Sequence, residues 1–132
     1  GAGREQIACT FDLAPTILAA AGGSPDSADA FEGSDLTDVI LRDAPSPHPW
    51  LAWSSGGQDA VREGSWKLVR NARDDQNRPL EGPDALFLAD LDADPAESKN
   101  LASDHPDVVA RLSQLHAGWA ARAAALAAAA AQ

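Results

Sequence analysis

Alternating acids at residues 90, 92 and 94, followed by Glu97, form a pattern of carboxylate oxygens that could bind Ca²⁺. An EF-hand calcium loop also needs Gly at its sixth position and Glu at its twelfth. Counted from Asp90, these positions hold Pro95 and Leu101. We therefore interpret the acids as a solvated strand end and turn, with Glu97 near its own backbone amides, and we predict no metal site here.

Side chains that can act as nucleophiles or zinc ligands are scattered along the chain. Ser54 and Ser55 lie outside any Gly-x-Ser-x-Gly pattern, which argues against a self-sufficient serine hydrolase. His105 and His116 have no Cys or acid at ligand spacing. The single cysteine, Cys9, rules out an intrachain disulfide and any multi-thiolate zinc site. We predict no zinc site.

Four short apolar runs predict β-strands over residues 50–53, 60–62, 66–70 and 86–91. Glu63-Gly64 predicts the hairpin turn between the second and third strands. In the third strand, Trp66 and Leu68 should share one face, with Lys67 and Val69 on the other. We expect Lys67 to be exposed or in an intramolecular salt bridge.

The first third of the chain predicts two short helices. Residues 7–22 have one apolar stripe at helical spacing, with Thr10 as the predicted cap. Residues 36–42 follow a loop over residues 23–33, with Ser34 or Asp35 as the predicted cap and with Leu36, Val39 and Ile40 facing inward. Three prolines within residues 43–49 then predict an extended linker.

A long C-terminal helix is predicted to begin at Asp104, before His105-Pro106. Its apolar stripe should pack across one face of the sheet, and consists of Val108, Leu112, Leu115, Trp119 and Leu126. From Ala123 onward the chain is nearly all alanine, which permits a helix but offers little to bury, so we expect fraying there.

Composition excludes several classes of partner. The chain has 132 residues, 20 acidic against 10 basic ones, a net charge of −10 and a pI near 4.4, so it should repel nucleic acids and anionic membranes. No apolar run approaches the roughly 20 residues of a membrane helix. Its length predicts a single domain. Because the chain contains no Met and begins with Gly, we expect it to be a piece of a longer protein.

Four patterns in sequence order resemble the sulfatase family, the arylsulfatase-like branch of the alkaline phosphatase superfamily. Residues 12–22 are similar to its DLxPTLLxxAG helix and residues 31–36 to its LDGxSL turn. Residues 60–69 are similar to AVRxGxWKLV, and residues 86–112 to LYDLxxDPxExxNLAxxHPxxVxxL. The last two are the more specific. Together the four cover nearly the whole chain, but only the C-terminal minority of such an enzyme.

The resemblance implies an α+β fold in two parts. Residues 1–42 would form short helices that end the large N-terminal α/β domain of a sulfatase. Residues 43–132 would form its C-terminal subdomain, a small four-stranded antiparallel sheet packed by the long C-terminal helix. The partner of the chain would be the remainder of the catalytic domain, and the substrate of the whole enzyme a sulfate ester.

The resemblance also implies hydrolysis of that ester at a formylglycine beside a divalent cation, usually calcium. The formylglycine arises in a Cys/Ser-x-Pro-x-Arg motif. Cys9 is followed by Thr10-Phe11-Asp12-Leu13, and no Ser in the chain fits the motif. We therefore assign no catalytic residue, metal ligand or cofactor to this chain, and predict that it is inactive alone.

Sulfatase loops that lead into the small sheet can border the substrate cleft, which makes His48, Trp53 and Arg62 candidates for its rim. An aromatic face can stack on a sugar or aryl group, and Arg can pair with an anionic substituent. The alternative is that Trp53 is a sheet-edge packing residue and Arg62 a cross-strand ion-pair partner, which is the commoner fate of such residues in short strands.

Three functions remain open on the sequence alone. The chain is the C-terminal portion of a sulfatase, or the tail of a related phosphatase or phosphonate hydrolase, or a free-standing α+β module that binds a partner or glycan through its tryptophans. In the first case the absent domain should leave an apolar face exposed, which would promote association. That face includes Ile7, Phe11, Ile17 and Leu18.

Overall fold

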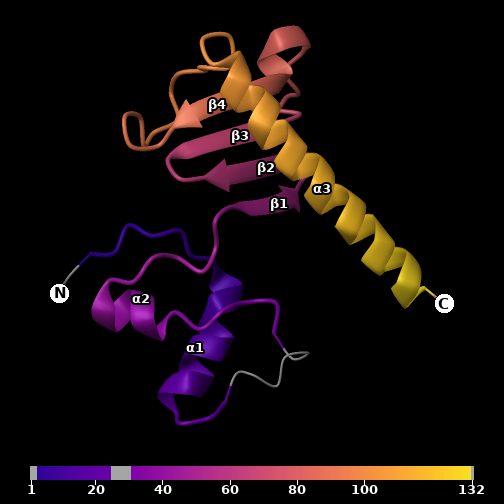
Figure 1. Cartoon of the computed structure of the whole chain (residues 1–132). Helices are drawn as coiled ribbons and strands as arrows, with labels where there is room; N and C mark the ends of the chain where they lie inside the picture. Colours follow the sequence, from indigo (N-terminus) through magenta and orange to yellow (C-terminus); the bar gives the residue numbers. More distant parts are fainter. Residues whose placement is uncertain (1–2, 25–30, 132) are drawn as a thin grey trace. The chain divides into compact units, whose positions relative to one another are not determined.

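The computed structural model describes residues 3–24 and 31–131 (Figure 1). Residues 25–30 of the predicted 23–33 loop lie outside the described residues. The chain divides into two compact units, residues 1–49 and 50–132. Each unit is described by itself below.

In the first unit, the helix predicted over residues 7–22 is divided into a 3₁₀ turn, η1 (Thr10–Asp12), and an α-helix, α1 (Leu13–Ala20). The predicted cap at Thr10 is wrong, because Cys9 occupies the N-cap position of η1 and donates its backbone N–H to the Asp12 carboxylate at 2.8 Å. Pro15 lies in the first turn of α1. Backbone N–H groups in the first turn have no acceptor within the helix, so the N–H that proline lacks costs no helical hydrogen bond.

The second helix of this unit, α2 (Thr37–Arg42), begins one residue later than predicted, with Leu36 at its N-cap. Asp35 accepts the backbone N–H of Thr37 at 2.8 Å. Leu36 and Val39 are buried as predicted. Ile40 was predicted to face inward as well, but it is 50% exposed, because a helix this short can bury only one narrow stripe.

The second unit contains a four-stranded sheet in the order β1-β2-β3-β4, with every neighbouring pair antiparallel. The strands are β1 (Leu51–Ser55), β2 (Gln58–Glu63), β3 (Trp66–Arg70) and β4 (Leu86–Asp90), and a short 3₁₀ helix, η2 (Gly82–Ala85), precedes β4. The β2–β3 turn is Gly64-Ser65, one residue later than predicted, because Glu63 still pairs with Trp66. Gly64 takes a positive φ of 58°, which favours glycine.

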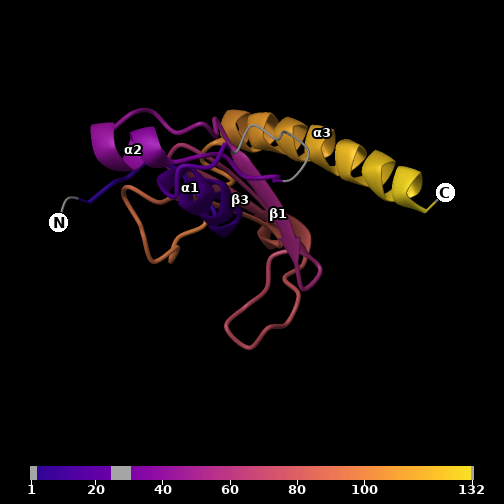
Figure 2. The same cartoon turned by 90° about the horizontal axis from the view of Figure 1, so that it is seen from below.

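The long helix α3 (Pro106–Ala130) packs on one face of this sheet (Figures 1 and 2). The predicted faces of β3 are confirmed: Trp66 and Leu68 contact the core beneath α3, and Lys67 and Val69 line the opposite face. The fully packed core consists of Val61, Leu68, Leu88, Val108 and Leu112. The α+β fold predicted from the sequence is therefore correct.

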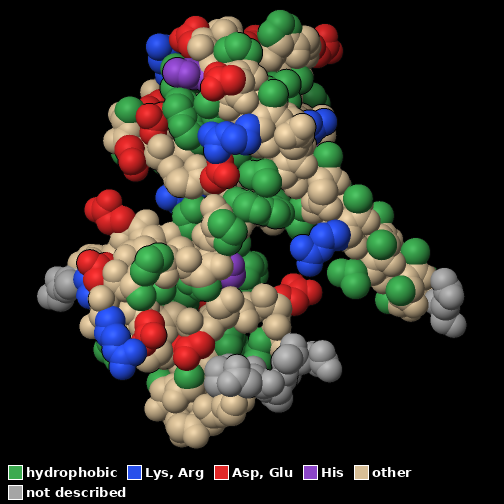
Figure 3. Space-filling model, in the orientation of Figure 1, with side chains coloured by type: hydrophobic (Ala, Val, Ile, Leu, Met, Phe, Trp, Pro, Cys, Tyr) green, Lys and Arg blue, Asp and Glu red, His purple; other side chains and the backbone are tan. Residues whose placement is uncertain are grey.

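Two details of α3 differ from the prediction. Its N-cap is His105 and not Asp104. Leu126 does not pack on the sheet and is 69% exposed, because about 25 helical residues span roughly 38 Å while four strands span less than about 20 Å. The alanine-rich end of α3 is exposed throughout (Figure 3). Among the described residues, no helix combines the length and apolar character that a membrane crossing requires.

Candidate functional site

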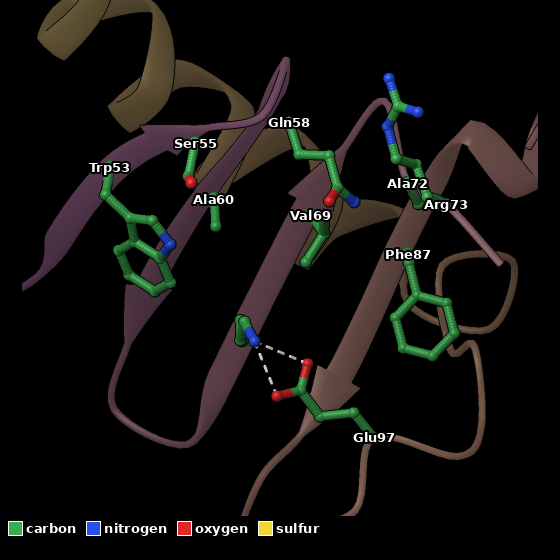
Figure 4. A pocket seen from close by; sticks show the side chains of 10 residues that line it. Trp53, Ser55, Gln58, Ala60, Val69, Ala72, Arg73, Phe87 and Glu97 are labelled. Carbon is green, nitrogen blue, oxygen red and sulfur yellow. Dashed lines mark hydrogen bonds and ion pairs between the residues drawn. The ribbon is translucent and has the colours of Figure 1, made fainter. Parts of the chain in front are cut away.

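A hollow of about 370 Å³ lies on the face of the sheet opposite α3 (Figure 4). It is built on a row of directly paired residues, Trp53–Ala60–Val69–Phe87, that crosses all four strands. Directly paired residues in antiparallel strands point to the same face. The large rings at the two ends and the small side chains between them produce the concave surface. The remaining lining residues are Ser55, Gln58, Lys67, Ala72, Arg73 and Glu97.

Trp53 forms one wall of this hollow and Phe87 the other (Figure 4). Trp53 is 40% exposed because β1 is an edge strand. The Nζ atom of Lys67 lies 6.0 Å from the centroid of the Trp53 ring, at the outer limit of a cation–π contact. The Trp53 ring therefore offers a free apolar surface beside a cation.

Lys67 and Glu97 form an ion pair at one end of the hollow (Figure 4). Lys67 Nζ donates to both carboxylate oxygens of Glu97, at 2.7 and 2.8 Å. The salt bridge predicted as one option for Lys67 is thus confirmed. The Glu97 carboxylate accepts from Lys67, and the backbone amides of Ser98 and Lys99 donate to Asp94.

Asp94 shapes the turn that presents Glu97. Its Oδ2 atom accepts the backbone N–H groups of Ser98 and Lys99, at 2.7 and 3.0 Å. Partial burial raises the pKa of Asp94, but these N–H groups outweigh it and hold the pKa below its ordinary value. Within this turn Glu97 has a φ of 53°, in the left-handed region that non-glycine residues rarely occupy. The turn therefore holds Glu97 in a costly backbone conformation that points its carboxylate at Lys67.

Polar groups also lie at the other end of the hollow, where Ser55 and Gln58 come from the β1–β2 hairpin. Arg73 borders this end, but its guanidinium points away from Val69 (Figure 4). Arg73 Nη1 donates to the carbonyl of Asn77 at 2.8 Å. The cation of Arg73 is thus directed at its own loop.

Of the predicted rim residues, Trp53 lines the hollow and Arg62 does not. Arg62 lies on the same face of the sheet, paired in register with Lys67, and its Nε donates to the carbonyl of Gly64 at 3.1 Å. Among the residues described, no ion pair includes Arg62. The predicted cross-strand ion pair is therefore wrong, since the residue directly opposite Arg62 is another cation.

His48, the third candidate, belongs to the first unit, where its Nε2 lies 2.8 Å from Oδ1 of Asp12. The Asp12 side chain is fully buried and also accepts the backbone N–H groups of Cys9 and Ser34, each at 2.8 Å. Burial alone would raise the pKa of Asp12, but these N–H groups and His48 together hold it below its ordinary value. Asp12 thus joins three separate segments.

The central role of Asp12 was not predicted, because a single acid after a possible cap suggests only a favourable charge at a helix N-terminus. In the structure, Asp12 instead contacts residues 31–36, the segment that resembles the LDGxSL turn. Position 33 has no room for a side chain, because an added Cβ would clash with the carbonyl oxygen of Phe11. This close approach lets Ser34 reach Asp12, and Leu36 donate its N–H to Thr16 Oγ1 at 2.9 Å. The signal was present in the family patterns, where Asp12 and Gly33 are both fixed letters.

Comparison with known proteins gives a consistent result, although no protein-family model matches the chain. An uncharacterised sulfatase of Schizosaccharomyces pombe is 27% identical over 124 residues, covering 82% of this chain. The chain is thus similar in sequence to a sulfatase over most of its length. It spans 20% of the length of the S. pombe sulfatase.

Solved structures share the fold of most of this chain. A Bacteroides thetaiotaomicron protein labelled 6S-sulf, from work on the metabolism of multiple glycosaminoglycans, is 24% identical with a TM-score of 0.59. The match covers 81% of this chain and 24% of that protein. A second protein, solved with its substrate D-glucosamine-2-N,6-O-disulfate, is 20% identical with a TM-score of 0.55, and the match covers 79% of this chain and 22% of that one.

The residues of the chain do not fit the calcium ion and formylglycine that sulfatases imply. Among the residues that the structure describes, no group of three or more His, Cys, Asp or Glu side chains could hold a metal ion. Asp94 and Glu97 already accept hydrogen bonds from their own loop and from Lys67. Cys9 serves as the N-cap of η1 and lacks the Pro and Arg of the formylglycine motif.

Proposed function

We propose that the chain is the C-terminal part of a sulfate-ester hydrolase, where it completes the fold and borders the substrate cleft. The observation that carries this proposal is the match to a sulfatase sequence over 82% of the chain. The proposal is also supported by solved structures that share the sheet and helix of this chain. In this proposal residues 1–42 end the large domain and residues 43–132 form the smaller subdomain.

The chemical step belongs to a part of the protein outside this chain. The chain has no Cys/Ser-x-Pro-x-Arg motif, and the candidates for metal ligands are engaged in turns and ion pairs. Formylglycine and calcium would therefore be supplied by the remainder of the catalytic domain. The chain alone should hydrolyse nothing.

The contribution of this chain to substrate binding would be a surface at the cleft rim. Trp53 has the best support among the three rim candidates, because its ring is exposed beside a hollow. Arg62 is next, because no carboxylate among the described residues pairs with it and its Nε donates to the carbonyl of Gly64. His48 is the weakest, because Asp12 already occupies its Nε2 atom. A structural relative has a sulfated amino sugar as its substrate, which favours a sulfated saccharide here as well.

One experiment tests the function directly. The reading frame that contains this chain is expressed in full with a formylglycine-generating enzyme, and turnover of p-nitrophenyl sulfate is compared with that of the 132-residue chain. We expect turnover by the longer protein, none by the chain, and loss of turnover when the Cys or Ser of the upstream motif is replaced by Ala. Hydrolysis by the isolated chain, or a frame without the motif, would refute the proposal. Turnover of p-nitrophenyl phosphate but not sulfate would instead assign the protein to the related phosphohydrolases.

A further inference from the structure

We propose that the hollow on the open face of the sheet binds one pyranose ring of a saccharide, and that it recognises the ring and its hydroxyl groups and not a sulfate group. The inference deepens the proposed function, on which it rests for the identity of the saccharide as substrate. Binding by the hollow can nevertheless be measured without any turnover.

The shape of the hollow suits a ring. Trp53 and Phe87 lie at opposite ends of a floor that includes Ala60 and Val69 (Figure 4). A pyranose has a C–H face that packs on an aromatic ring, and its hydroxyl groups project around its edge. Ligand sites combine apolar walls with a few polar groups that fix orientation, and their volumes begin at roughly 300 Å³. At about 370 Å³ the hollow is large enough for one ring and too small for an extended oligosaccharide.

The polar groups lie where hydroxyl groups would meet them. The Lys67–Glu97 pair occupies one end of the floor, and Gln58 occupies the other. A lysine ammonium has three donors, and a carboxylate has about four acceptor positions, so the pair keeps free donors and acceptors after its own hydrogen bonds. A hydroxyl group can use both because it donates and accepts.

The charges in the hollow disfavour a sulfate group. Both oxygens of Glu97 lie within 2.8 Å of Lys67 Nζ, so the cation is already neutralised and an anion would meet the carboxylate. Arg73 directs its guanidinium away from the floor (Figure 4). With a net charge of −10, the chain as a whole repels anions. The ligand that fits is therefore an uncharged part of a saccharide.

The test is an NMR titration of the ¹⁵N-labelled chain, whose four tryptophans each give one indole N–H signal. The probes are methyl β-D-glucopyranoside, D-glucosamine 6-sulfate and sodium sulfate at equal ionic strength. We expect both sugars to shift the Trp53 signal with similar dissociation constants, and sodium sulfate to leave it unchanged. Trp53→Ala should weaken sugar binding by roughly tenfold, read from the backbone signals of Val69 and Lys67.

Trp119→Phe is the matched control, because Trp119 lies on α3 beside His116 and does not line the hollow. This variant should bind both sugars like the unchanged chain. Trp53→Leu keeps an apolar side chain in β1 and provides the same test if Trp53→Ala does not fold. The proposal is overturned if neither sugar shifts the Trp53 indole signal, or if sodium sulfate shifts that signal in the absence of sugar. It is also overturned if Trp53→Leu binds sugar as tightly as the unchanged chain. Sugar binding without sulfatase turnover by the longer protein would refute the proposed function and leave this site standing.

Discussion

The Asp12 carboxylate lies fully buried with His48 Nε2 at 2.8 Å from its Oδ1 atom, and this contact joins residues 36 positions apart. The same carboxylate accepts N–H groups from Cys9 and Ser34. One ionised side chain thus connects η1, the segment before α2 and the proline-rich linker. The consequences can be tested by mutation.

Asp12→Ala should lower the free energy of unfolding by about 3 kcal/mol, because it leaves the N–H groups of Cys9 and Ser34 buried without an acceptor. Urea denaturation followed by circular dichroism measures the change. Asp38→Ala is the control, because Asp38 forms an exposed pair with Arg42 within α2 and should change little. Equal losses in the two variants would contradict the role given to Asp12.

The stability that Asp12 contributes should disappear in acid. Its pKa is lowered in the folded chain, so its contribution is complete above the unfolded pKa of about 3.9 and is lost as the pH falls through the lower folded value. Asp12→Asn has no such titration, and the other acids are common to both proteins. The difference in unfolding free energy between them should therefore shrink between pH 7 and pH 3. A constant difference over that range would argue against an ionised Asp12.

Two leucines of α3 should respond differently to truncation. Leu112 is completely buried against the sheet, so Leu112→Ala should cost about 2–5 kcal/mol of stability. Leu126 is 69% exposed on the same helix, so Leu126→Ala should have almost no effect in the same urea titration. A large loss for Leu126→Ala would mean that the end of α3 packs on something in solution.

Two substitutions of Glu97 can separate the effect of backbone strain from the effect of losing the ion pair with Lys67. Both Glu97→Ala and Glu97→Gly remove the carboxylate, but only glycine adopts a φ of 53° without cost. We expect Glu97→Ala to be less stable than Glu97→Gly by about 1 kcal/mol. If the two variants unfold at the same urea concentration, the left-handed conformation of this turn carries no strain.

The exposed apolar residues of the first unit should make the chain associate. Phe11 and Ile17 are exposed, as predicted, and Ile17 is 66% exposed. Ile7 differs from the prediction because its side chain is buried. Ile17→Ser should reduce association measured by sedimentation velocity, whereas Leu126→Ser, an equally exposed change on α3, should not. Equal effects would show that the first unit has no special interface.

The sequence alone predicted the four strands, the long C-terminal helix and the resemblance to sulfatases, although it missed several helix ends and caps. Alternating side chains predicted the two faces of β3, and helical spacing predicted where Leu112 would pack, because these periods depend only on local backbone geometry. Sequence likewise showed that the formylglycine motif is absent, since that motif is a fixed run of residues.

Only the tertiary structure brought distant residues together. Asp12 meets Ser34 and His48, and Lys67 meets Glu97, through contacts between segments that are 22 to 36 residues apart. The hollow depends on strand register, which places Trp53, Ala60, Val69 and Phe87 in one row. If the register of any strand pair shifted by one residue, these four side chains would no longer lie in one row. The sequence of each strand would be unchanged, because register is set by contacts between strands.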